Sequence, residues 1–99
     1  VQVVDGVNER KQRMYELSDA FIILPGGIGT LNELTDIMTM QQIGETKKPL
    51  FFLNTDNFWA PFARLFVHMH NCGFIEDIKD YDISIAATPA DLEREIKSF

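Results

Sequence analysis

The segment that decides the fold reads Ala20-Phe21-Ile22-Ile23-Leu24, followed at once by Pro25-Gly26-Gly27-Ile28-Gly29-Thr30. A continuous apolar run of this kind is typical of a strand in a parallel sheet, because such strands are covered on both faces. The glycines that follow let the backbone approach a ligand or another segment closely. Leu31, Leu34, Ile37 and Met38 then recur at helical spacing. The segment therefore predicts a strand, a glycine-rich loop and a helix in succession.

The same alternation continues on both sides of this segment. Apolar runs predict strands at 50–53 and 83–87, and residues 1–4 form a possible short strand. Helical patterns cover about 8–18, the stretch between Pro61 and Gly73, and a last helix that Thr88 opens as N-cap. This order predicts an α/β fold: a Rossmann-like parallel sheet with flanking helices and right-handed crossovers.

The length limits the domain organisation to one unit. A doubly wound sheet has about five or six strands, whereas this sequence offers three firm strands and one short one. Neither a repeat nor a linker divides the 99 residues. We therefore expect residues 1–99 to be a single, partial domain, the C-terminal half of a larger one.

Composition excludes several classes of function. Nine Lys and Arg against fifteen Asp and Glu give a net charge of −6, which does not favour nucleic acid as a partner. No apolar run reaches the ~18 residues of a membrane span. Cys72 is the only cysteine, and it is interpreted as a buried thiol of a cytoplasmic protein rather than as a nucleophile. His68 and His70 have the wrong helical spacing for a metal site.

The glycine loop carries the clearest chemical signal. It lacks the Walker lysine and does not match the dinucleotide spacing, so a phosphate monoester held by backbone N–H groups and the Thr30 hydroxyl fits best. A tight turn without a ligand is the alternative.

Glu33 and Arg10 each allow two interpretations. Glu33 either completes a capping box with Thr30 or faces the bound ligand. Arg10 lies one turn before Met14 and two before Leu17 on an apolar stripe. There it either meets an anionic partner or extends to solvent.

Two motifs together resemble a known family. Glu9-Arg10-Lys11, followed by Pro25-Gly26-Gly27-Ile28-Gly29-Thr30-Leu31-Asn32-Glu33, is similar to the signature of the LONELY GUY (LOG) family. These are cytokinin riboside 5'-monophosphate phosphoribohydrolases, often named lysine decarboxylases. Segments 18–21, 42–44, 48–49 and 53–56 also resemble family segments in the expected order.

The resemblance implies a site and a reaction. It implies that Gly26, Gly27, Ile28, Gly29 and Thr30, together with Lys11, bind the 5'-phosphate and substrate, and that Arg10 and Glu33 are catalytic. The reaction would be hydrolysis of the N-glycosidic bond of a nucleoside 5'-monophosphate, such as AMP, by a homodimer without metal or cofactor. The alternatives are a non-catalytic nucleotide-binding or carrier module of the same superfamily, and an inactive fragment.

Overall fold

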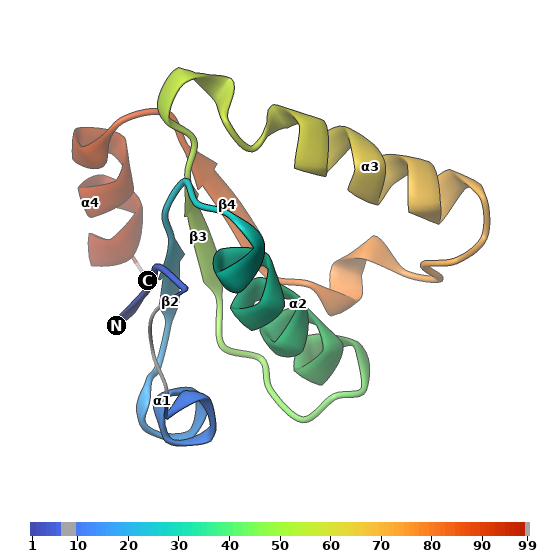
Figure 1. Cartoon of the computed structure of the whole chain (residues 1–99), viewed down its shortest axis with the longest axis horizontal. Helices are drawn as coiled ribbons and strands as arrows, with labels where there is room; N and C mark the ends of the chain where they lie inside the picture. The colour runs from blue at the N-terminus through green and yellow to red at the C-terminus, as the bar shows by residue number, and fades with distance from the viewer. Residues whose placement is uncertain (7–9, 99) are drawn as a thin grey trace.

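The computed structural model describes residues 1–6 and 10–98 as a four-stranded parallel sheet with helices on both faces (Figure 1). The strands lie in the order β1-β2-β3-β4, so each new strand adds to the same edge of the sheet. Between consecutive strands the chain returns through a helix, as parallel pairing requires. The elements are β1 Gln2–Val4, α1 Lys11–Leu17, β2 Phe21–Ile23, α2 Ile28–Gln42, β3 Leu50–Leu53, α3 Ala60–Asn71, β4 Ile83–Ala86 and α4 Pro89–Lys97, with 3-10 turns at Thr55–Asn57 and Ile78–Asp80.

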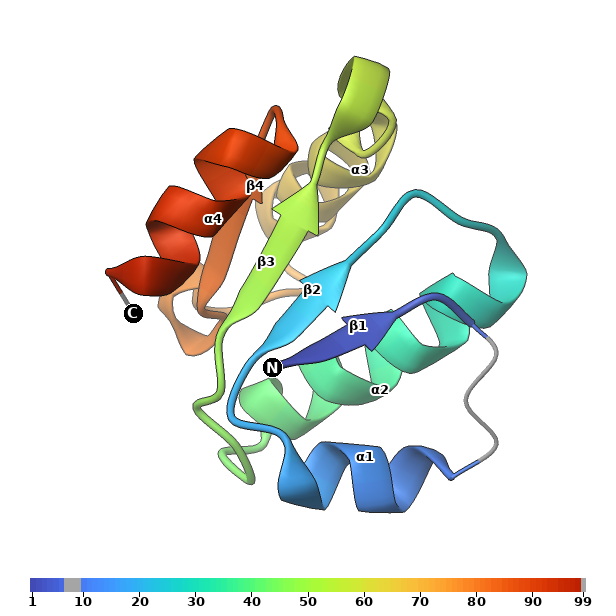
Figure 2. The same cartoon turned by 90° about the vertical axis from the view of Figure 1, so that its left-hand side faces the viewer.

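The two faces of the sheet are covered unequally. Figures 1 and 2 show α2 and α3 on one face and α4 on the other, where α4 packs against β3 and β4. The α2 face holds the larger apolar core, centred on Val4, Ile23 and Phe52. The α4 face has a small core, and Val3 on that face is 41% exposed. The fold is the predicted α/β arrangement, with its apolar contacts concentrated on the α2 face.

The sequence placed every strand correctly and most helix ends to within a few residues. The predicted strand at 20–24 is Phe21–Ile23, the strand at 83–87 is Ile83–Ala86, and the short N-terminal strand is present as β1. Thr88 caps α4 by accepting a hydrogen bond from the Asp91 N–H at 3.2 Å, as predicted.

Helix α1 differs from its prediction. It begins at Lys11, with Arg10 as its N-cap, and the first residues of the predicted helix lie outside the described part of the chain. Met14 is buried, but Leu17 is 72% exposed, so the predicted apolar stripe was wrong at its end. Tyr15 is the second buried residue of α1 instead. The Lys48 ammonium satisfies the last carbonyls of this helix, donating to Tyr15 O at 2.7 Å and Glu16 O at 3.2 Å.

The prediction of a buried cysteine was wrong. Cys72 is exposed, because it ends α3 just before Gly73 turns the chain with a φ of 87°. Phe58 is also 46% exposed, because it lies in the turn before α3. Its neighbour Trp59 is buried and packs edge-on against Phe52.

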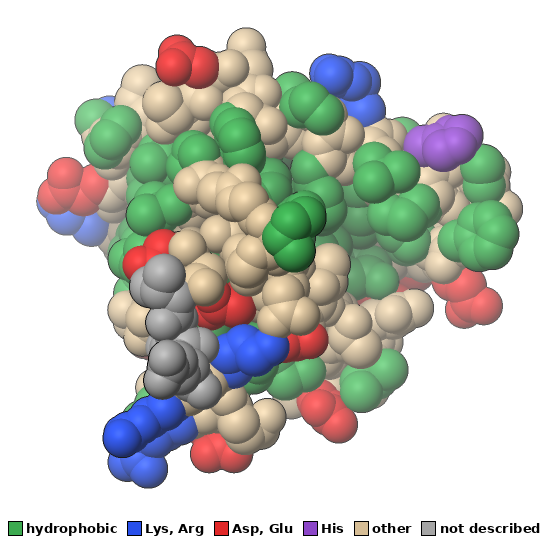
Figure 3. All heavy atoms as spheres, viewed as in Figure 1, with side chains coloured by type: hydrophobic (Ala, Val, Ile, Leu, Met, Phe, Trp, Pro, Cys, Tyr) green, Lys and Arg blue, Asp and Glu red, His purple; other side chains and the backbone are tan. Residues whose placement is uncertain are grey.

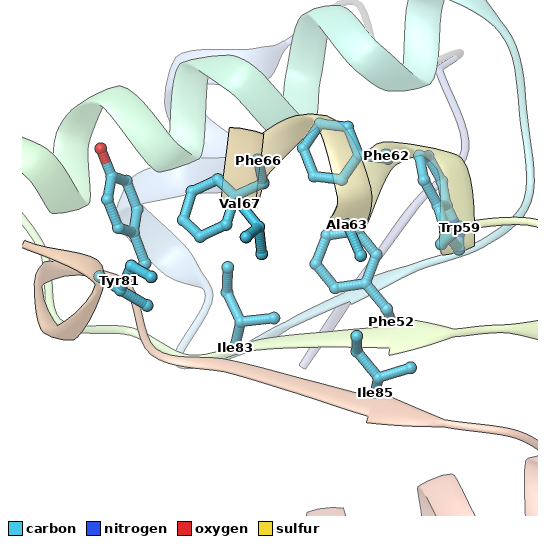
Figure 4. A pocket seen from close by; sticks show the side chains of 10 residues that line it. Phe52, Trp59, Phe62, Ala63, Phe66, Val67, Tyr81, Ile83 and Ile85 are labelled. Carbon is cyan, nitrogen blue, oxygen red and sulfur yellow. The ribbon is translucent and has the colours of Figure 1, made fainter. Parts of the chain in front are cut away.

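An apolar cavity of about 270 Å³ separates α3 from the sheet. Figure 4 shows Trp59 and Phe66 on the α3 side of the cavity and Phe52, Ile83 and Ile85 on the sheet side, with Tyr81 also lining it. Figure 3 shows apolar side chains gathered over the same helix. The cavity lies on the α2 face and is formed by β3 and the part of the chain that follows it.

The packing of Phe52 predicts a large loss of stability on truncation. Phe52 is 2% exposed and stacks on Phe62, so Phe52→Ala should lower the free energy of unfolding by about 3–5 kcal/mol. Phe74 is 81% exposed, so Phe74→Ala should change the free energy of unfolding by less than about 0.5 kcal/mol. Urea unfolding of both variants checks this, and equal losses would contradict the described core.

Candidate functional site

The candidate site lies where the carboxyl ends of β1 and β2 meet. These neighbouring parallel strands deliver Gly6 and the glycine loop to the same edge of the sheet. A Cβ atom at Gly26 would lie 2.2 Å from Thr30 Oγ1, and one at Gly6 would lie 2.8 Å from Thr30 N. Gly6 also has a φ of 87°, which favours glycine. Both glycines are therefore needed for the two loops to close over Thr30.

The first turn of α2 is open to solvent beside this contact. The helix begins at Ile28 with Gly27 as N-cap, and no side chain caps its N–H groups. Gly26, Gly27 and Gly29 are exposed, and Ile28 is 81% exposed. The first N–H groups of a helix have no partners within it and carry a partial positive charge. The predicted phosphate-binding residues are thus brought together around a helix N-terminus that an anion can reach.

Glu33 lies one turn deeper on the same helix. It is 2% exposed, and neither of its carboxylate oxygens makes a hydrogen bond of ordinary geometry within the described residues. The Thr30 hydroxyl is likewise buried and unpartnered there. The capping-box interpretation was wrong, because Thr30 is inside a helix that begins at Ile28 and is not its N-cap. Buried polar groups are normally hydrogen-bonded, so this pair is typical of a site that a ligand completes.

The surroundings of Glu33 favour its protonated form. Burial is the largest effect and raises the pKa of Glu33, and the negative charges of Asp5 and Asp36 raise it further. The Gly6 N–H and the Lys11 ammonium act in the opposite direction and lower it. The net result is a pKa above the ordinary value of a glutamate, which is typical of carboxyl groups that exchange protons with a substrate.

Helix α1 brings the other predicted residues to the flank of α2. The Lys11 ammonium donates to Asn32 Oδ1 and to Asp36 Oδ2, the latter at 3.2 Å. Arg10 is exposed at the N-terminal end of the same helix. Lys11 therefore lies within electrostatic reach of Glu33, and Arg10 immediately precedes it in the chain.

Sequence reasoning did not find Gly6, Tyr15 or Asp36. Gly6 had a usable signal, because a glycine that follows a strand next to β2 must meet the glycine loop. Asp36 lies three residues after Glu33 and so shares its helix face. Tyr15, four residues after Lys11, donates a hydrogen bond to Asp36 at 3.0 Å. That contact depends on how α1 packs, which helical spacing alone does not predict.

Two other kinds of feature are absent from the described residues. No group of three or more His, Cys, Asp or Glu side chains there could hold a metal ion. Among the helices of this part of the chain, none combines the length and apolar character needed to cross a membrane.

The contact between Gly26 and Thr30 predicts different effects for adjacent glycines. Gly26→Ala places a methyl group against a buried, β-branched side chain and should cost about 1–3 kcal/mol of stability. A Cβ atom at Gly27 meets nothing within 4 Å, so Gly27→Ala should cost only about 0.5–1 kcal/mol as a less favourable N-cap. Thermal unfolding of both variants measures this, and a greater loss at Gly27 would contradict the arrangement of the loop.

The raised pKa of Glu33 predicts a pH-dependent gain in stability for Glu33→Gln. The folded state holds the Glu33 proton more tightly than the unfolded state, so the wild type loses stability as pH rises from the unfolded to the folded pKa. Glutamine does not titrate, so the variant should gain relative to the wild type between pH 4 and pH 7. Urea unfolding at both pH values measures the difference, and one that does not grow with pH would contradict the burial of this charge.

The sequence matches one family model and several curated relatives. Residues 1–96 match a family model described as "Possible lysine decarboxylase". The chain is 42% identical over its whole length to cytokinin riboside 5'-monophosphate phosphoribohydrolase LOG of Oryza sativa subsp. japonica, of which it covers 41%. It is 33% identical over its whole length to LOG7 of Arabidopsis thaliana, covering 46% of that protein.

A bacterial relative shows the same likeness over a shorter stretch. The cytokinin riboside 5'-monophosphate phosphoribohydrolase of Rhodococcoides fascians is 39% identical over 75 residues, which is 76% of this chain and 38% of that protein. The chain spans less than half the length of each of these relatives. On the match of the family model and these identities, the chain belongs to the LOG family, whose model carries the description "Possible lysine decarboxylase".

Proposed function

We propose that this chain carries the phosphate-binding and catalytic half of a phosphoribohydrolase that acts on nucleoside 5'-monophosphates. The observation that supports it best is a pair of buried groups, Thr30 Oγ1 and the Glu33 carboxylate, next to an open helix N-terminus. Neither has a hydrogen-bond partner among residues 1–6 and 10–98. The names of its relatives supply one substrate class, cytokinin riboside 5'-monophosphates, and the family resemblance adds AMP. Since the chain covers only part of those proteins, the remaining half of the domain would complete the site.

The glycine loop supplies the grip on the 5'-phosphate in this proposal. The N–H groups at Gly26, Gly27, Ile28 and Gly29 and the Thr30 hydroxyl would hold the phosphate oxygens, and Lys11 would add positive charge nearby. This binding energy arises far from the bond that breaks, so it positions the ribose over Glu33.

Glu33 and Arg10 then carry the chemistry. As the C1'–N bond breaks, its electron pair leaves with the base and positive charge develops on the ribose, which the Glu33 carboxylate stabilises. Water bonds to C1' and gives a proton to the Glu33 carboxylate, whose raised pKa favours accepting it. The departing base takes up a proton from solvent, and Glu33 returns its proton to solvent after turnover. Arg10 stays protonated and orients Glu33 or the departing base. The products are the free base and ribose 5-phosphate, and no metal or cofactor takes part.

We also propose that the enzyme is a cytoplasmic homodimer. Family resemblance supports the dimer, and the use of a single cysteine, Cys72, supports a reducing compartment. Sedimentation of the complete polypeptide tests the dimer directly.

The proposed roles predict that Arg10→Ala and Glu33→Gln each lower the release of adenine from AMP by roughly 100-fold or more. The assay uses the complete polypeptide that carries this sequence, with adenine measured by liquid chromatography. Arg94→Ala is the matched control, because Arg94 is exposed on α4 and pairs only locally, with Asp91. It should keep full activity.

Two outcomes would contradict this proposal. Full activity in either site variant would remove the role given to that residue. Tight binding of AMP by the wild type without release of adenine would instead favour a nucleotide-binding or carrier module.

A further inference from the structure

Four polar side chains join α1 to α2 next to Glu33, and the proposed reaction leaves the central one without a role. Asp36 Oδ2 accepts hydrogen bonds from the Tyr15 hydroxyl at 3.0 Å and from the Lys11 ammonium at 3.2 Å. Lys11 also donates to Asn32. We call Lys11, Tyr15, Asn32 and Asp36 the α1–α2 clasp. Asp36 is its centre, since two donors from α1 meet on one of its oxygens.

Helix α1 depends on such contacts for its position. It has seven residues, far fewer than an isolated helix needs to be stable in water. Its N-cap, Arg10, provides no side-chain cap, and its first turn has no acidic residue. Lys48 holds only the carbonyls at the opposite end. Met14 and Tyr15 of α1 are buried in the core, and the clasp adds polar contacts between the Lys11 end of α1 and α2.

The hydrogen bond from Tyr15 is the stronger of the two that Asp36 accepts. The Lys11–Asp36 ion pair is more than one-third exposed at both side chains, so solvent screens it. Tyr15 is 7% exposed, and its burial and the bond to Asp36 raise the pKa of its hydroxyl well above the ordinary value. The hydroxyl therefore stays a donor, and a bond to a charged acceptor is stronger than a neutral one.

Asp36 also acts on Glu33 through its charge. Among the described residues, the charged groups that act on Glu33 are Asp5 after β1, Lys11 on α1 and Asp36 on α2, and the Gly6 N–H acts on it from the loop after β1. Asp5 and Asp36 favour protonation of Glu33, whereas Lys11 opposes it. Without the negative charge of Asp36, the positive charge of Lys11 would lower the pKa of Glu33 with less opposition from nearby carboxylates. The carboxyl group of Glu33 would then titrate at lower pH.

We propose that Asp36 is a positioning residue of this site. It holds the Arg10 end of α1 in register with the turn of α2 that bears Glu33. The expected effect on catalysis rests on the proposed function. The contact between the two helices rests only on the two hydrogen bonds to Asp36.

The test is Asp36→Asn, which keeps the shape of the side chain and removes its charge. In the complete polypeptide, kcat for adenine release should fall roughly 10- to 100-fold, as for a small misplacement of a catalytic group, and KM should change less than about 3-fold. The acidic limb of the pH profile should move to lower pH. Asp36→Glu should recover most of kcat, and Glu93→Gln, an exposed acid-to-amide change on α4, should alter nothing.

Two measurements without substrate separate this inference from the proposed function. Carbon NMR titration should give a lower pKa for Glu33 in Asp36→Asn than in the wild type, and hydrogen exchange should show faster exchange in α1. If Asp36→Asn does not fold, Tyr15→Phe removes one donor and should show faster α1 exchange with a several-fold loss of kcat.

The outcomes are distinguishable. A wild type that releases no base contradicts the proposed function, while the titration and the exchange still decide whether Asp36 positions α1 and tunes Glu33. An unchanged Glu33 pKa together with unchanged α1 exchange in Asp36→Asn would overturn the inference. A loss of stability with unchanged kcat and an unchanged pH profile would also overturn the inference, because it would show that the role of Asp36 is purely structural.

Discussion

The close contact of two loops with Thr30 is the constraint on which the rest of the site depends. Gly6 follows β1 and Gly26 follows β2, and both approach Thr30 more closely than any side chain would permit. This contact starts α2 at Ile28 and points its open first turn outward. It also leaves Glu33 one turn deeper, where solvent does not reach it. Loop closure and the burial of the carboxylate are therefore consequences of one packing arrangement.

The buried carboxylate is then controlled by segments from three parts of the chain. The β1 loop supplies Asp5 and the Gly6 N–H, α1 supplies Lys11, and α2 supplies Asp36. An uncompensated buried charge is costly, so this site gains a group that exchanges protons readily while the protein loses stability at neutral pH. This conflict between local stability and chemistry is common at functional sites.

The order of strands and helices was predictable because each apolar run has the period of its element and each connection is short. The segment at 50–53 became β3 with those bounds, and Thr88 caps α4 as expected. The helix starts near the site were harder. Thr30 and Glu33 match a capping box, yet the helix begins two residues before Thr30, at Ile28. A local motif was overridden by the packing of a neighbouring loop.

The sequence by itself determined the alternation of strands and helices, the glycine loop and the presence of an acid one turn after it. Only the tertiary structure decided that Glu33 is buried without a hydrogen-bond partner in the described part of the chain, and that Asp36 joins α2 to Tyr15 and Lys11. The physical reason is range. Periodicity and capping act over a few residues, whereas these contacts bring together side chains that are 21 and 25 positions apart in the chain.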